Sequence, residues 1–200
     1  MTTDTMAPAY KKLKPVSHAE FGMWVGLASF GMLFATLFLS YGLARLRAPI
    51  WPPIGVEPLP KLLPTLSTCV LLLSSYFIHQ AIIGFKNFHR PIFLKNWNLA
   101  SLCGAAFVIC QLILWRQVGL LGTHLGSGLF GGIFYAMTGL HVLHILGGIA
   151  SLTWVRIRAR KKGFFSPQHG KLSQAPKLAA MYWHFMDFIW ILMYFLLIWI

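Results

Sequence analysis

The chain has 200 residues, of which 17 are Lys or Arg and four are Asp or Glu, and its formal net charge is +13. Hydrophobic residues make up 57% of it and charged residues 10%, against about 25% charged residues in a soluble domain. Intrinsic disorder is excluded because it requires low hydrophobicity. A soluble nucleic-acid-binding protein is not favoured either, since its basic stripes would lie on a charged, polar exterior. The composition indicates a polytopic membrane protein of one domain.

The predicted elements are five helices that are long enough to cross a membrane. A hydrocarbon core of about 30 Å requires about 20 apolar residues in a helix. The qualifying stretches are residues 19–43, 64–84, 97–118, 128–155 and 178–200. The fourth exceeds the length of a span, so we expect it to tilt or to extend past the lipid headgroups. Residues 18–200 are thus predicted to form an all-α transmembrane bundle, preceded by a polar tail at residues 1–17. Small residues spaced four apart, such as Gly22 and Gly26, indicate close helix packing.

The distribution of basic residues predicts the orientation of this bundle. Thirteen of the 17 Lys and Arg residues fall in the N-terminal tail and in the connections after the second and fourth spans, which all lie on one side of the membrane. The other four fall on the opposite side. Because basic residues are retained in the cytoplasm, we predict a cytoplasmic N-terminus and an external, periplasmic C-terminus. The same rule explains the basic connection between the fourth and fifth spans without a nucleic-acid partner.

Ionisable residues within the spans are the candidates for a functional site, because each costs about 2.5–3.5 kcal/mol to insert. Asp187 is roughly 14 Å deep in the fifth span at about 1.5 Å per residue, and His184 lies on the same helix face. His141 and His144 form a second pair with the same spacing. His144 and Asp187 have similar depths, as do His79 and His184. We expect one interior cluster of His79, His144, His184 and Asp187, with His141 further out.

Three roles are compatible with this cluster: a hydrogen-bonded clamp between helices, a proton relay or lipid-headgroup contact, and a metal or haem site. The spacing of His141 and His144 is a weak metal signal, because it lacks the carboxylates of di-iron bundles and completes no set of four ligands. The clamp is favoured. Among the aromatic residues, Trp183 and Trp190 flank Asp187 and are expected to pack around it, whereas Trp51 is expected at a membrane interface.

Four segments resemble the subunit III family of haem-copper terminal oxidases, also called cytochrome c oxidase polypeptide III. Residues 181–190, MYWHFMDFIW, are similar to the family's YWHFVDVVW sequence, and residues 138–144, TGLHVLH, are similar to its TGFHGLHV sequence. WPP at residues 51–53 and LSTCVLL at residues 66–72 resemble its WPP turn and its LNTSVLL segment. The similarity covers most of residues 18–200. Long members of the family have seven helices and short bacterial members have five, so the chain resembles a short bacterial form.

The resemblance implies an accessory subunit, without catalytic residues or a cofactor of its own, in a complex of the bacterial cell membrane that reduces oxygen to water and pumps protons. Haem and copper are then expected in subunits I and II. Subunit I is the implied main contact, subunit II belongs to the same complex, and other respiratory complexes are further candidate partners. In the family, subunit III holds phospholipids, supports proton uptake and protects the active site during turnover. The motif positions His141, His144, His184 and Asp187 transfer as structural or lipid-proximal residues.

Two alternatives remain open from the sequence. Within the family, the chain is also compatible with subunit III of a quinol oxidase or with a homologue that accompanies a nitric oxide reductase. Outside it, a small membrane transporter could use the His and Asp cluster. The chain also departs from the family pattern, since Phe30 stands where the family usually has a buried Glu, and no acidic residue follows Gln111 in the third span.

Overall fold

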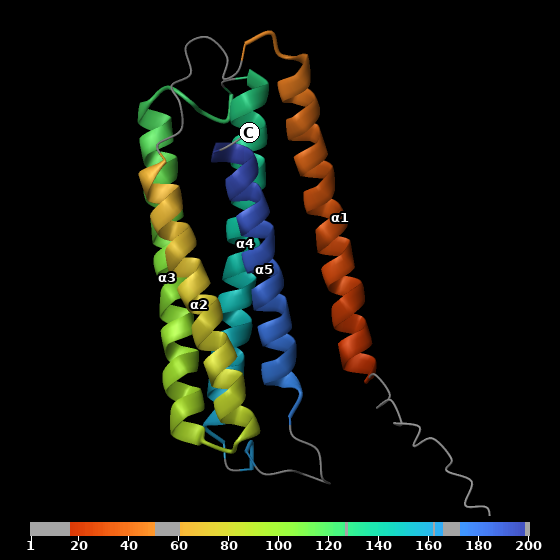
Figure 1. The fold of residues 1–200 in the computed structure, drawn as a ribbon, viewed down its shortest axis with the longest axis vertical. Coiled ribbons are helices and arrows are strands. Elements are labelled where there is room, and N and C mark those ends of the chain that lie inside the picture. Colours follow the sequence, from red (N-terminus) through yellow and green to blue (C-terminus); the bar gives the residue numbers. More distant parts are fainter. Residues whose placement is uncertain (1–16, 51–60, 127, 162, 166–172, 199–200) are drawn as a thin grey trace, which may run out of the picture.

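The computed structural model describes residues 17–50, 61–126, 128–161, 163–165 and 173–198. They form the helices α1 (His18–Arg47), α2 (Leu62–Lys86), α3 (Arg90–Leu120), α4 (Gly128–Ala159) and α5 (Ala175–Ile198) (Figure 1). All five are long and apolar enough to cross a membrane, and no strand occurs in the part of the chain that the structure describes. The predicted all-α class and the five spans are confirmed.

The largest boundary difference lies at the start of α3, which begins at Arg90 rather than at residue 97. Pro91 occupies the first turn of this helix. A proline is tolerated there because the first amide groups of a helix have no partner within the helix. The proline therefore helps to start α3 instead of prolonging the preceding turn.

Helices α2 to α5 form the compact part of the bundle, and α1 packs against α4 and α5 only. Figure 1 shows α1 diverging from α5 toward the end at which both helices begin. We call this end, which includes the starts of α1, α3 and α5 and the last turns of α2 and α4, the basic end. There, the Ser17 hydroxyl donates to Gln174 Oε1 at 2.8 Å and Lys177 Nζ pairs with Glu20 Oε1 at 2.7 Å.

Trp183 of α5 packs as a wedge between α3 and α4 in the centre of the compact part. Its indole is fully buried and lies between two helices at positions where each has a glycine. A Cβ atom on Gly104 of α3 would come within 2.6 Å of the ring, and one on Gly148 of α4 within 2.9 Å. Because both positions are glycine, the indole of Trp183 fits into the contact between α3, α4 and α5.

Candidate functional site

Helices α2 and α5 are joined by side-chain hydrogen bonds between residues 65–75 of α2 and residues 183–194 of α5. We call this row the polar seam. It consists of four pairs: Thr65 with Tyr194 at 2.8 Å, Thr68 with Trp190 at 2.9 Å, Ser74 with Trp183 at 3.0 Å, and Ser75 with His184 at 2.6 Å. Both indole N–H groups donate to hydroxyl oxygens. In membrane bundles such bonds contribute about 0.6 kcal/mol each on average, so the seam joins the two helices at several depths.

Asp187 lies next to this seam, one turn beyond His184 on α5. It is only 4% exposed. The Ser75 hydroxyl lies near the Asp187 carboxyl and bonds to His184. Neither carboxyl oxygen meets the geometry of a hydrogen bond with any described residue. His79 follows Ser75 by one turn on α2, on the side of that helix near His184. The seam therefore brings His79, His184 and Asp187 to one side of α5.

His144 faces the other way, toward α1. Its ring centroid lies 4.6 Å from that of Phe30 and 5.5 Å from that of Phe34. Its Nδ1 atom is 2.6 Å from the carbonyl oxygen of Leu140 in its own helix. The Tyr182 hydroxyl of α5 donates to the backbone carbonyl of His144 at 2.9 Å. His144 thus belongs to the contact between α1, α4 and α5.

The expected single interior cluster is consequently divided. His79, His184 and Asp187 lie at α2 and α5, whereas His144 lies against α1, and the exposed side chain of His79 corrects its expected interior position. His141, which is expected nearer the outer side of the membrane than the other three, is fully buried within the bundle. Sequence spacing predicts how deep each residue lies in the membrane but not which neighbouring helix its side chain faces. Residues at the same depth on different helices can therefore face different neighbours.

The aromatic residues of the candidate site also have defined places. Trp183 and Trp190 are buried, as expected for residues that flank Asp187, but each also spans to a hydroxyl group of α2. Trp51 lies outside the described residues. The serine and threonine partners on α2 were missed, because short hydroxyl side chains are common in membrane helices and usually bond to their own backbone. No three His, Cys, Asp or Glu side chains among the described residues are close enough to hold a metal ion.

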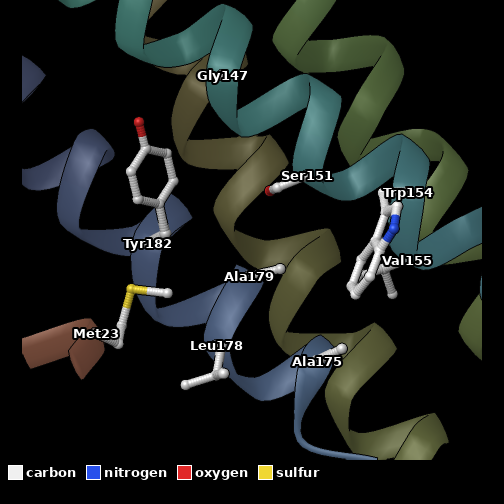
Figure 2. Close-up of a pocket in the computed structure, with 9 residues that line it drawn as sticks. All are labelled: Met23, Gly147, Ser151, Trp154, Val155, Ala175, Leu178, Ala179 and Tyr182. Atoms are coloured by element: carbon white, nitrogen blue, oxygen red, sulfur yellow. The ribbon is translucent and has the colours of Figure 1, made fainter. Parts of the chain in front are cut away.

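A cleft of about 450 Å³ opens between α1, α4 and α5 at the basic end. Figure 2 shows Met23 of α1 near Leu178 and Tyr182 of α5, with Trp154 of α4 on the opposite wall. The lining is mostly apolar. The guanidinium carbon of Arg158 stands 4.2 Å from the centre of the Trp154 ring. The cleft therefore combines an apolar interior with a cation beside its wall.

Comparison with known proteins gives one consistent family. The family model described as cytochrome c oxidase subunit III matches residues 10–200. Cytochrome c oxidase subunit 3 of Thermostichus vulcanus is 33% identical over 183 residues, which cover 90% of this chain and 88% of that protein. The protein of the same name from Synechocystis sp. is 30% identical over 176 residues, 88% of this chain and 73% of that protein. A probable cytochrome c oxidase subunit 3 of Nocardia farcinica is 33% identical over 173 residues, 85% of this chain and 82% of that protein.

Proposed function

The chain belongs to the cytochrome c oxidase subunit III family, and from this premise we propose that it stabilises the redox subunits of a respiratory haem-copper oxidase without carrying a redox centre. Subunit I is the proposed main contact, subunit II belongs to the same complex, and these two chains hold the haem and copper. The match over residues 10–200 is the observation that carries the proposal. A helix bundle tied together by its own polar seam is suited to such a supporting role.

Purification in a mild detergent tests this assignment. We expect the chain to migrate with larger haem-containing subunits on a blue-native gel, and we expect the complex to oxidise reduced cytochrome c. Oxidation of quinol instead would place the chain with the quinol oxidases, and association with a nitric oxide reductase would place it with those homologues. A chain that purifies alone and supports ion or solute flux in liposomes would overturn the proposal in favour of a transporter.

We further propose that the cleft at the basic end holds phospholipid. Its apolar walls suit acyl chains, and Arg158 places positive charge near it, where a phosphate group would be attracted. Replacing Ala179 in the cleft wall by Trp should displace the lipid. Leu112→Trp is the control, because Leu112 is 52% exposed on α3, away from the cleft.

Lipid extraction and mass spectrometry of the purified complex would then show less phospholipid per haem in Ala179→Trp than in Leu112→Trp. We also expect the first variant to inactivate sooner during turnover, because the family role includes protection of the active site. Equal lipid content in the two complexes would refute the lipid assignment while leaving the membership of the complex intact.

The orientation is proposed from the charge distribution. We propose that the tail at residues 1–17 and the basic end face the cytoplasm, the side from which the oxidase takes up protons, and that the C-terminus faces outward. Fusion of alkaline phosphatase and of a fluorescent protein to each end of the chain tests this. Phosphatase activity is expected only from the C-terminal fusion and fluorescence only from the N-terminal one, and the reverse pattern would contradict the proposal.

A further inference from the structure

Three polar side chains in the middle of the bundle are buried without a hydrogen bond. Gln111 of α3 and His141 of α4 are 0% exposed, and Asp187 of α5 is 4% exposed. Within the described part of the chain, the amide group of Gln111, both ring nitrogens of His141 and both carboxyl oxygens of Asp187 have no partner. Burial of a polar group without a partner is unfavourable, so each of these three groups calls for an additional ligand.

A layer of three rings positions these groups. The ring of His141 lies 5.8 Å from Phe107 of α3 and 5.3 Å from Trp190 of α5, and Phe107 and Trp190 are 4.8 Å apart, centroid to centroid. Gln111 follows Phe107 by one turn, and Asp187 precedes Trp190 by nearly one turn. Both α3 and α5 begin at the basic end.

Gln111 and Asp187 consequently lie on opposite sides of the ring layer. Their separation along the bundle is about 10 Å at about 1.5 Å per residue, which is too long for a direct hydrogen bond. His141 lies between them. A neutral imidazole offers one N–H donor and one acceptor nitrogen, so His141 has one polar atom available for each neighbour.

We propose that Gln111, His141 and Asp187 bind internal water molecules, which bridge His141 to Gln111 and His141 to Asp187. A buried water usually makes about three hydrogen bonds to polar groups that lack other partners. Here the amide, the imidazole and the carboxyl supply both donors and acceptors. The bridges join α3, α4 and α5, and Ser75, beside Asp187 and bonded to His184, connects them to the polar seam. The α2–α5 clamp then extends to four helices through water.

Hydroxyl-radical footprinting of the intact oxidase by X-ray radiolysis tests this proposal, because radicals formed from bound water modify the adjacent side chains. We expect His141 to be modified although it is fully buried. Met137 is the matched control, since it lies one turn away on α4, is also 0% exposed and has a more reactive side chain. Modification of His141 at least threefold above that of Met137 would support the water site.

The same measurement on Asp187→Leu should lower His141 modification several-fold, whereas Leu112→Trp on the exposed face of α3 should leave it unchanged. His141 as unreactive as Met137 would overturn the proposal. Equal strong modification of both residues would also overturn it, because it would report a bundle that opens rather than a local water site.

A high-resolution cryo-EM map of the complex provides a second readout that does not depend on any variant. We expect density for water about 2.7–3.2 Å from the Asp187 carboxyl and from the His141 ring nitrogens. Direct contact of the His141 ring with both neighbours, or a dry contact surface around it, would refute the inference. Neither experiment depends on the phospholipid or on the electron donor, so the water site and the proposed function can fail separately.

Discussion

Replacing Gly104 by alanine places a methyl group against the ring of Trp183. The added Cβ atom would lie 2.6 Å from Cη2 and 2.8 Å from Cζ2 of the indole, whereas carbon atoms in contact are normally about 3.5–4.0 Å apart. The ring would have to move by about 1 Å. The ring is also in close contact with Gly148 on the α4 side, where an added Cβ atom would lie 2.9 Å from it, and its N–H donates to the Ser74 hydroxyl at 3.0 Å. It therefore has little room to move. Overpacking of this kind costs about 1–3 kcal/mol.

The assay is the thermal stability of the purified complex, followed by the loss of this chain from the haem-containing subunits on heating. Gly104→Ala is expected to release the chain several degrees earlier than the wild type. Gly139→Ala is the matched control, because Gly139 lies within α4 and, in the described part of the chain, no atom comes within 4 Å of an added Cβ atom there. Alanine favours helix over glycine by up to about 1 kcal/mol, so the control should be neutral or stabilising. Equal behaviour of the two variants would refute the wedge role of Trp183.

Two further substitutions compare a strong contact with a weak one, and the free energy of unfolding of the chain in mixed micelles is the measurement for both. Ser75→Ala removes the 2.6 Å bond to His184 and should destabilise the chain by about 0.6–1.7 kcal/mol. Ser29→Ala, at an exposed hydroxyl that bonds to the backbone of its own helix, should have little effect, and equal effects would show that the seam does not join the helices. Glu20→Gln breaks the ion pair with the largely exposed Lys177 and should cost less than about 1 kcal/mol, so a larger loss that persists in high salt would contradict its description as a surface contact.

The number and approximate limits of the helices follow from the sequence, because insertion into lipid depends mainly on the length and polarity of each segment. The direction in which each helix faces does not. A membrane helix is apolar on all sides, so its pattern does not distinguish the protein-facing side from the lipid-facing side. His79 shows the consequence: its predicted depth matches that of His184, yet its side chain is exposed.

The glycines give the same lesson about packing. Gly22 and Gly26 have the small-residue spacing of close helix contacts, but no atom of the described residues lies within 4 Å of an added Cβ atom at either position. The close approach occurs instead at Gly104 and Gly148, which come from two different helices and meet at one indole ring. Sequence spacing cannot predict a pair of this kind, because the two glycines lie on different helices and meet only through the register between α3 and α4.

Phe30 connects the family resemblance to the packing of α1. The family's buried Glu would place a carboxyl group in α1, whereas the Phe30 ring lies 4.6 Å from His144 and 6.1 Å from Tyr182. The Tyr182 hydroxyl bonds to the backbone of His144, so α1 meets this part of α4 and α5 through the aromatic ring at residue 30. The deep carboxyl of the described chain is therefore that of Asp187, on the opposite side of α5.

The difference between the contacts of α1 and those of α2 explains why the cleft lies beside α1. Helices α2 and α5 are joined by a row of hydrogen bonds, whereas α1 meets α4 and α5 through aromatic contacts and through the polar groups of Ser17 and Glu20 at its first turn. Ring contacts of this kind have no hydrophobic driving force in lipid to hold helices together. Acyl chains can therefore replace protein packing along α1 at low cost, while the same exchange along α2 would leave hydroxyl, indole and imidazole groups without partners.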